Sequence, residues 1–320
     1  MTEEAGGVEE CAGAKRQKGI RGVGGDEVPW SVKHFRRGVD AGARERWAEM
    51  WPAGEAVGRR ALEEFVGRRI GAYKSMRDIP SEVGTSMLSH HLAVGSVSAR
   101  QCVAAACEAN GGRLHRGSEG IDGWIEEIVW REFYKHLLVG YPRLSKGRAF
   151  KEETERIEWS DDEGHFDAWC EGRTGYPIVD AAQRQLLDVG WMHNRLRMIS
   201  AMFLTKHLLT DWRKGERWFM RHLIDGDLAS NNGGWQWSAS TGTDAQPYFR
   251  VFNPTTQSER FDPDGAFIRR YVPELADVEG KAIHEPTRAG LFEKLDYPEP
   301  IVEHKKARAR AIEVFKALKE

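Results

Sequence analysis

Residues 225–237 combine side chains that favour binding of a flat, polar ligand. Asp225 and Asp227 open this stretch, two asparagines and a diglycine follow, and Trp235 and Trp237 close it. The stretch is too polar for a hydrophobic core and too rich in indoles for an ordinary loop, so we expect an irregular backbone shaped around a large ring system. The D-x-D pattern lacks further carboxylates at useful spacing, so no metal site is expected.

The chain contains twelve tryptophans. For any one of them, core packing is the ordinary role. As a set they also suggest electron transfer, because an indole can give up and regain an electron. Trp235 flanks the proposed ring site, and Trp212 is expected at the end of a buried helix just upstream of it.

A second set of residues places an acid between two indoles on one helical surface. Trp124, Glu127 and Trp130 follow i, i+3 spacing. One interpretation is a pocket for a nucleobase, in which Glu127 faces an aromatic wall. The other is an ordinary helix, in which Glu127 lies in solvent and pairs with Arg131.

An amide, a guanidinium and a thioether share one face near residue 194. These groups belong to Asn194, Arg197 and Met198. If Arg197 is buried it needs an anionic partner, which Asp225 or Asp227 can provide.

Two weaker sequence signals indicate phosphate binding. Tyr73, Arg77 and the turn at residues 84–89 offer hydroxyls and backbone N–H groups. Residues 133–151 carry five lysines and arginines and no acid. This basic strip is either a phosphate-facing surface or a solvated loop.

The elements that must position these residues are helices. Apolar residues recur at helical spacing over residues 55–73, 121–138 and 178–187, and Ser98 is placed to cap a helix over residues 100–108. Residues 191–209 are apolar nearly all round, which predicts a central buried helix. No alternating strand–helix pattern occurs, so an all-α fold with long functional loops is expected.

Length and composition exclude several classes of protein. At 320 residues and a net charge of −2, the chain can bury a large core but has no global positive charge for nucleic acid, so such binding needs a local patch. Four cysteines without C-x-x-C spacing indicate reduced thiols. No membrane span or secretory leader is evident, so we expect a cytoplasmic protein, associated with the nucleoid if it is bacterial.

With these residues assembled, the chain resembles the FAD-binding catalytic domain of class I cyclobutane pyrimidine dimer photolyases, in the photolyase and cryptochrome family. The resemblance runs from about Trp51 to the C-terminus. It is carried by Tyr73-x-x-x-Arg77-Asp78, Gly84-Thr85-Ser86, Trp130-Arg131-Glu132-Phe133-Tyr134, Thr174-Gly175-Tyr176-Pro177, Trp191-Met192-His193-Asn194-Arg195 and the Asp225 to Trp237 stretch.

The resemblance implies that FAD is the cofactor, active in its reduced form FADH⁻ and bound in a bent, U-shaped conformation. The implied binding residues are Tyr73, Thr85, Ser86, Met87, Leu88, Ser89, Asn194, Arg197, Asp225, Gly226 and Asp227. Asn231 is implied beside flavin N5. Plant cryptochromes typically carry Asp at this position and animal cryptochromes Cys, so an Asn favours a repair enzyme. Trp235, Trp212 and Trp159 fall on the electron-transfer chain of the family, from flavin side to surface.

The resemblance also implies light-driven repair of pyrimidine dimers in UV-damaged DNA, by electron transfer from excited FADH⁻ to a flipped-out dimer. The residues implied on the substrate or DNA side are Arg77, Glu127, Trp130, Arg131, Tyr134, Asn194, Arg195, Met198, Trp237 and Gln257. A cryptochrome-like photosensor and a flavin- or DNA-binding remnant without repair activity are the alternatives. The chain is expected to be a monomer.

The chain departs from the family in two places. Met87 stands where Arg is usual, beside the presumed phosphate turn, and His90-His91 replaces a Pro-aromatic pair. The loss of a cation predicts weaker FAD binding, which the affinity of Met87→Arg for FAD tests. The family's N-terminal α/β antenna domain is expected to be absent, and with it the antenna chromophore, leaving a disordered tail (1–29), a residual linker (30–50) and a helical FAD-binding catalytic domain (51–320).

Overall fold

The computed structural model describes residues 41–288, 290 and 295–318. The chain divides into two compact units, residues 1–50 and residues 51–320. Of the first unit the structure describes one helix, α2 (Ala41–Met50), which falls in the predicted linker. The predicted tail, residues 1–29, lies outside the described residues.

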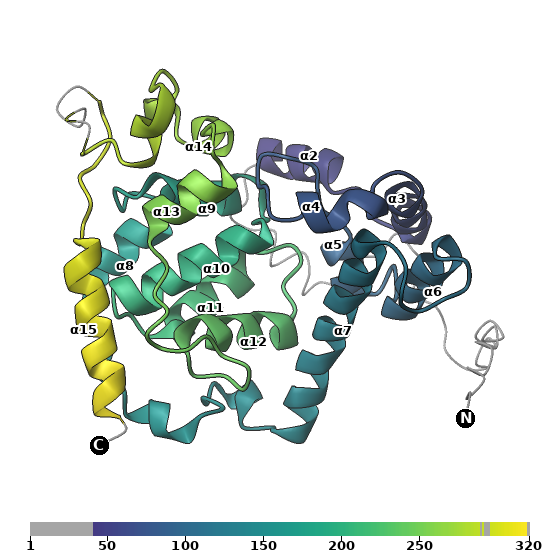
Figure 1. Ribbon diagram of the computed structural model, residues 1–320, viewed down its shortest axis with the longest axis horizontal. Coiled ribbons are helices and arrows are strands. Elements are labelled where there is room, and N and C mark those ends of the chain that lie inside the picture. Colours follow the sequence, from purple (N-terminus) through teal and green to yellow (C-terminus); the bar gives the residue numbers. More distant parts are fainter. Residues whose placement is uncertain (1–40, 289, 291–294, 319–320) are drawn as a thin grey trace. The chain divides into compact units, whose positions relative to one another are not determined.

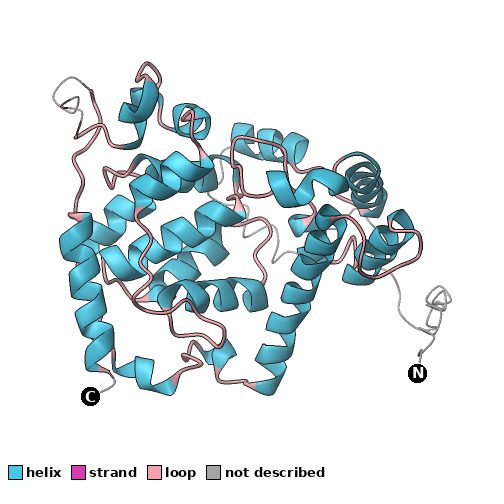
Figure 2. Ribbon diagram, in the orientation of Figure 1, coloured by secondary structure: helices cyan, strands magenta, loops and turns pink. Residues whose placement is uncertain are grey.

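The second unit is built from helices joined by turns and loops (Figures 1 and 2). Across the described residues the backbone forms no β-strand, and a single bridge joins Ser160 to Thr210. The predicted all-α fold is therefore confirmed. The helices are α3 (Glu55–Arg68), α4 (Tyr73–Met76), α5 (Ser89–Val94), α6 (Ala99–Ala109), α7 (Glu119–Gly140), α8 (Glu163–Cys170), α9 (Pro177–Val189), α10 (Asn194–Met202), α11 (Trp212–His222), α12 (Leu228–Ala239), α13 (Pro254–Phe261), α14 (Ala266–Tyr271) and α15 (His304–Ala317).

Side-chain caps set where several of these helices begin. Ser98 and Gln101 form a reciprocal capping box at the start of α6, as the sequence predicts. Asp211 caps α11 and Asp227 caps α12, each by accepting a hydrogen bond from a backbone N–H of the first turn. Such a cap stabilises a helix by about 1 kcal/mol relative to alanine.

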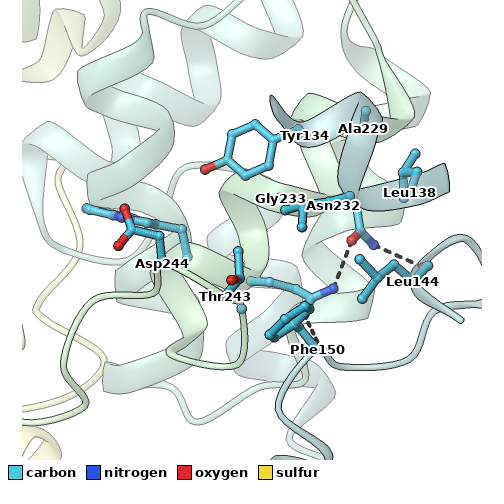
Figure 3. A pocket seen from close by; sticks show the side chains of 13 residues that line it. Tyr134, Leu138, Leu144, Phe150, Ala229, Asn232, Gly233, Thr243 and Asp244 are labelled. Carbon is cyan, nitrogen blue, oxygen red and sulfur yellow. Dashed lines mark hydrogen bonds between the residues drawn. The ribbon is translucent and has the colours of Figure 1, made fainter. Parts of the chain in front are cut away.

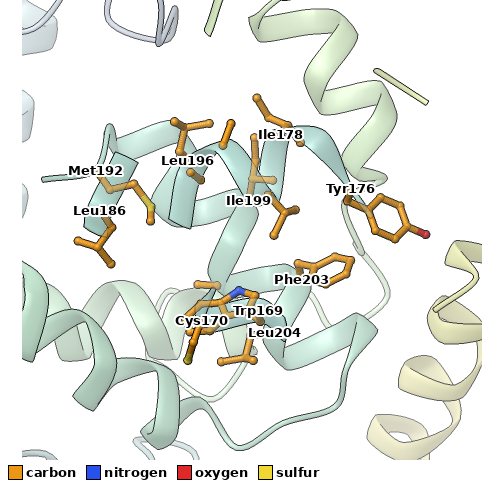
Figure 4. Close-up of a cluster of buried hydrophobic side chains, with 14 of the residues drawn as sticks. Trp169, Cys170, Tyr176, Ile178, Leu186, Met192, Leu196, Ile199, Phe203 and Leu204 are labelled. Carbon is orange, nitrogen blue, oxygen red and sulfur yellow. The ribbon is translucent and has the colours of Figure 1, made fainter. Parts of the chain in front are cut away.

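The larger hydrophobic core lies among α8, α9, α10, α11, α12 and α14. Figure 4 shows part of it, with Trp169 of α8, Leu196 of α10 and Met192 from the segment between α9 and α10. Trp169 is fully buried, and its indole Nε1 donates a hydrogen bond of 3.2 Å to the carbonyl of Ser200.

The smaller core joins α3, α6 and the first half of α7, with Phe65, Cys102, Ala106 and Trp124 at its centre. Helix α7 contacts α4 and α6 on this side and α12 on the other. The second half of α7 therefore extends from the smaller core to α12 of the larger one. The cavity described below lies beside this half of the helix.

Three expectations about individual elements were wrong. Residues 228–239 form a regular helix instead of an irregular segment, because Asp227 caps it and its glycines allow close packing. Trp212 begins α11 and does not end the preceding helix, since Asp211 caps a new helix there. Residues 191–209 are not one helix: α10 ends at Met202 and a π-helical turn, η4 (Phe203–His207), follows.

The helix predicted over residues 55–73 is also interrupted. Helix α3 ends at Arg68, and a 3₁₀ turn, η1 (Ile70–Ala72), leads into the short helix α4. The break turns Tyr73 and Arg77 toward α7. No helix in the described part of the chain is long and apolar enough to cross a membrane.

Candidate functional site

A cavity of about 570 Å³ opens between α4, α5, α7, α10 and α12. Its volume lies within the range of small-molecule and cofactor sites. Fifteen of the predicted site residues line it: Tyr73, Arg77, Thr85, Ser89, Glu127, Trp130, Arg131, Tyr134, Asn194, Arg195, Arg197, Met198, Asp225, Asp227 and Trp237. The fold thus brings together predicted residues that are up to 164 positions apart in the sequence (73 to 237).

A smaller hollow of about 130 Å³ adjoins this cavity deeper in the unit. The two hollows share Asn194, Arg197, Met198, Asp225, Asp227, Ser230 and Gly234 as lining residues. Asn231 and Trp235 line the smaller one. The shared wall makes one continuous site that narrows from α7 toward the larger core.

An ion pair fixes the polar centre of the site. Arg197 Nη2 lies 2.8 Å and 3.0 Å from the two carboxylate oxygens of Asp225, and Arg197 Nε donates to the Met192 carbonyl at 2.7 Å. The Asp225 side chain is 2% exposed, so the guanidinium supplies the charge that a buried carboxylate needs. The predicted anionic partner of Arg197 is confirmed as Asp225.

The start of α12 brings backbone close to the cavity. Asp227 Oδ1 accepts from the Ser230 N–H at 2.9 Å, which orders the first turn. Gly234 lines both hollows, and a Cβ placed on it would meet nothing within 4 Å. Gly233, its neighbour, packs its backbone directly against the Tyr134 ring of α7.

Glu127 takes a partner that neither interpretation of the sequence named. Its Oε1 accepts a hydrogen bond from Arg77 Nη1, at the end of α4. Arg131 instead bonds Glu132 and the Leu92 carbonyl. The interpretation that pairs Glu127 with Arg131 is therefore wrong. Glu127 shares the cavity with Trp130 and Tyr134, and α4 packs directly on α7 to add Arg77.

A neighbouring pair uses Asp78, an acid that follows α4 in the chain. Arg195 Nη2 lies 2.9 Å from Asp78 Oδ1, and the Arg195 guanidinium carbon sits 4.3 Å from the centre of the Phe261 ring. Asp78 also lines the cavity. In each of these pairs, an arginine on the cavity wall is thus matched by a carboxylate.

Aromatic rings of α7 and α12 make the apolar side of the cavity. The Trp130 side chain is 41% exposed, with ring centres 5.3 Å from Phe133 and 6.1 Å from Tyr134. Trp237 lines the same cavity from α12. A large indole left this open on a cavity wall is suited to stacking on a flat ring.

Behind Tyr134 and Trp237 lies a third, mainly apolar hollow (Figure 3). Asn232 orders its floor: Gln236 Nε2 donates to Asn232 Oδ1 at 2.8 Å, and the Phe150 N–H donates to Gln236 Oε1 at 2.8 Å. These bonds tie the chain after α7 to α12. They hold the Tyr134 side of the cavity in place.

Two of the three tryptophans predicted for electron transfer are buried. Trp235 is 2% and Trp212 0% exposed, and neither indole Nε1 has a hydrogen-bond partner. Trp159 is partly buried at the edge of the larger core, where its ring centre lies 6.3 Å from Phe315. Trp169, whose ring centre is 6.0 Å from Trp235, was missed because no motif marks it.

The predicted phosphate turn reaches the cavity only in part. Thr85 and Ser89 line it, whereas Ser86, Met87 and Leu88 do not. Leu88 is fully buried in the smaller core. Met87 adopts a left-handed backbone with φ of 54°, and its Sδ lies 3.2 Å from the Thr85 hydroxyl.

Four other predicted residues lie outside the lining of these hollows: Gly226, Gln257, Trp159 and Trp212. In the basic strip, Arg143 pairs with Glu152, and Arg148 lies 3.8 Å from Glu155. Acids that follow the strip in sequence therefore neutralise part of it. Ser230 and Asp244, which line the large cavity, were not assigned a role from sequence, although the spacing from Asp227 to Ser230 is that of an N-cap.

Burial keeps several titratable groups around the site neutral at pH 7. Desolvation raises the pKa of Tyr134 to about 12, helped by Asp244 and Glu127. Burial lowers the pKa of His193, the N-cap of α10, to about 4. Among the described residues no three His, Cys, Asp or Glu side chains gather as a metal site.

Comparison with known proteins shows the family to which the chain belongs. The family described as the FAD-binding domain of DNA photolyase matches residues 124–317. The chain belongs to this family. The chain is 48% identical to the deoxyribodipyrimidine photo-lyase of Escherichia coli, over 98% of the chain and 65% of that relative.

Solved structures agree with this family. The crystal structure of a bacterial class III photolyase from Agrobacterium tumefaciens matches with a TM-score of 0.82 at 44% identity, over 88% of this chain and 59% of that one. The Synechocystis cryptochrome matches with a TM-score of 0.75 at 32% identity, over 82% of this chain and 56% of that one. The chain spans 46% to 65% of the length of curated relatives that it matches.

Proposed function

We propose that this chain binds FAD in the cavity between α10 and α12 and uses light to repair cyclobutane pyrimidine dimers in DNA. One observation carries the proposal. The cavity joins a polar centre, the Arg197–Asp225 pair, to an open aromatic wall with Trp130. A cofactor and an extruded pyrimidine dimer would thus meet in one cavity.

The donor set of the cavity suits a dinucleotide. Arg197, Asn194 and the hydroxyls of Thr85 and Ser89 offer hydrogen bonds to ribose and phosphate oxygens. The open side of Gly234 allows a flat ring to approach the α12 backbone. Met198 and Trp235 supply apolar contact beside these polar groups.

The predicted cofactor residues divide into two groups on this proposal. Tyr73, Thr85, Ser89, Asn194, Arg197, Asp225 and Asp227 would contact FAD from the cavity wall, and Asn231 would do so from the deeper hollow. Ser86, Met87, Leu88 and Gly226 would act through backbone placement, since their side chains do not line the hollows.

The substrate side would be formed by α7 and α12. Trp130 and Trp237 would stack on an extruded dimer, with Glu127 and Met198 at its edges. Extrusion of a nucleotide costs a few kcal/mol, and least where damage has already weakened stacking. The protein can therefore select a dimer partly by how easily it leaves the duplex.

When bound and fully reduced, FAD supplies the light-driven electron that opens the cyclobutane ring and takes the electron back afterwards. The chain's own residues bind, orient and exclude water. The Arg197–Asp225 pair and the α12 backbone would fix the cofactor, while Trp130 and Trp237 would fix the dimer against it. Trp235, Trp212 and Trp159 would pass electrons inward when the cofactor needs reduction.

DNA outside the cavity would be held by phosphate contacts of Arg77, Arg131, Arg195 and Gln257, and its affinity should fall with salt as counterions are released. We further propose that the chain acts as a monomer in the cytoplasm, on nucleoid DNA in a bacterium. A cryptochrome-like photosensor is the second candidate, because the Synechocystis cryptochrome shares the fold at a TM-score of 0.75.

The proposal is tested by reconstituting the chain with FAD, reducing it, and illuminating it with an oligonucleotide that contains one thymine dimer. Recovery of thymine absorbance in light, but not in darkness, is the expected result. Glu127→Ala should lower the yield per absorbed photon. A flavin-loaded chain that binds dimer DNA without restoring thymine would instead support the sensor or a remnant without repair activity.

A further inference from the structure

Two residues proposed to contact DNA contact each other in the protein alone. Arg77 ends α4, Glu127 lies fifty positions later on α7, and Arg77 Nη1 donates to Glu127 Oε1. Both side chains line the large cavity, where they are 24% and 39% exposed. The contact therefore sits at the solvent-open side of the proposed dimer pocket.

The Arg197–Asp225 pair of the same cavity differs in kind. Arg197 binds both oxygens of Asp225, whose side chain is 2% exposed. Removal of Arg197 there would leave a buried carboxylate without a partner. The Arg77–Glu127 pair joins one nitrogen to one oxygen and remains open to water, and such pairs contribute little to stability. Its partners can therefore exchange.

The two partners also suit different parts of a damaged DNA strand. A guanidinium binds a phosphate through two parallel hydrogen bonds, which a single carboxylate contact does not provide. A free carboxylate accepts hydrogen bonds, and the imide N3–H of a thymine is a donor. The Arg77 guanidinium also lies 5.7 Å from the Tyr73 ring centre, which keeps it near the cavity mouth when the carboxylate is released.

We infer that the Arg77–Glu127 ion pair is a latch that a DNA phosphate opens, and that it contributes to discrimination between damaged and undamaged DNA. A phosphate takes Arg77, and Glu127 is released toward the cavity. An extruded pyrimidine then supplies a hydrogen-bond donor to Glu127. This inference rests on the proposed function, because it requires DNA at this cavity.

Discrimination follows from what happens to the carboxylate. Undamaged DNA can take Arg77 but places no base in the cavity, so Glu127 loses its partner beside a bound polyanion. Dimer DNA replaces the lost partner with the extruded base. The unpaired carboxylate thus weakens the binding of undamaged DNA more than the binding of dimer DNA.

The test measures dark binding of flavin-loaded protein to two duplexes of one sequence, with and without a thymine dimer, by fluorescence anisotropy at fixed salt. Glu127→Gln removes the charge that holds Arg77. We expect it to bind undamaged duplex about three- to ten-fold more tightly than the wild type, and to lose about ten-fold in the ratio of the two affinities. Arg77→Ala should weaken binding to both duplexes.

Glu126→Gln is the matched control. Glu126 is exposed on the same helix and does not line the cavity, and its change to Gln removes the same charge. The double variant Arg77→Ala/Glu127→Gln should bind undamaged duplex as Arg77→Ala does, because the released arginine is gone. Flavin content of each variant reports whether the cavity is intact.

Two results would overturn the latch. One is equal affinity of Glu127→Gln and Glu126→Gln for undamaged duplex, and the other is additivity of the two single changes in the double variant. Wild-type protein that binds neither duplex would contradict the proposed function itself, and the latch with it. Wild-type discrimination that survives unchanged in Glu127→Gln would contradict only the latch.

Discussion

At the scale of single residues, the charge pairs of the cavity separate what spacing can predict from what it cannot. The need of Arg197 for an acid follows from electrostatics, and the buried Asp225 meets it at 2.8 Å. Glu127 had a candidate partner four positions away on its own helix, yet it binds Arg77 from another helix. Sequence gives the chemistry of each group, but the partner depends on how helices pack.

Asp225→Asn should destabilise the protein and reduce its flavin content. The change leaves the partly exposed Arg197 guanidinium beside a neutral amide, and loss of a hydrogen bond to a charged group costs about 1.5–3 kcal/mol. Urea unfolding and the ratio of flavin to protein measure the two effects. Asp227→Asn is the control for stability, because asparagine caps α12 as well as aspartate does. Equal unfolding free energies for the two variants would contradict this role of Asp225.

Trp235→Phe should abolish photoreduction of bound oxidised flavin while sparing repair by protein that was reduced beforehand. Trp235 is buried and lines the deeper hollow, whereas Trp159 lies at the edge of the core. Absorbance of the flavin during illumination with an external reductant measures the first effect. Trp218→Phe is the control, since Trp218 lies beside the same core without lining the hollow. Normal photoreduction in Trp235→Phe would show that electrons take another route, such as Trp169.

At the scale of elements, several of the longer helices were predicted from periodicity and caps, including α6, α7 and α9. Helix α12 was not, because asparagines and a diglycine disfavour a helix by propensity. Its formation depends on tertiary contacts: the Asp227 cap and the packing of Gly233 against α7. The π-helical turn after α10 likewise has no signal in the pattern of apolar residues.

Gly233→Ala should lower stability, and Gly234→Ala should not. A Cβ on Gly233 would overlap the Tyr134 ring of α7, whereas one on Gly234 would meet nothing within 4 Å. Overpacking of this kind costs about 1–3 kcal/mol, while alanine for glycine in a helix otherwise gains up to about 1 kcal/mol. Urea unfolding without flavin compares the two. Equal stabilities would mean that α7 and α12 do not pack as closely as the structure shows.

At the scale of the whole molecule, the fold class was predictable because helical periodicity recurs in several segments and no strand–helix alternation occurs. The arrangement of two cores with α7 passing between them was not, since the pattern gives each helix an apolar face but no partner. The resemblance to a known family supplied the assembly of distant residues into one site. Composition alone would have left their proximity unknown.

Stability should fall as pH is lowered from about 6.5 toward 4. Burial lowers the pKa of His193 to about 4 and, with His304 and Arg310 nearby, that of His207 to about 3. The unfolded chain then binds more protons below its own histidine pKa, so stability is present above pH 6.5 and lost below it. At pH 5 each fully buried histidine accounts for about 2 kcal/mol.

Urea unfolding between pH 7 and 5 measures this dependence. His193→Asn keeps a side chain that can cap α10 but removes the titrating group, so its stability should vary less with pH than that of the wild type. An identical pH dependence in the variant would contradict a neutral, buried His193.

The central claim is that a flavin and a pyrimidine dimer share one cavity, and fluorescence of the reduced flavin tests it most directly. Electron transfer to an adjacent dimer shortens the excited-state lifetime of the bound reduced cofactor. We predict a shorter lifetime when dimer DNA is added to the reconstituted chain, and no change with undamaged DNA of the same sequence. An unchanged lifetime while anisotropy shows the dimer DNA bound would contradict the claim.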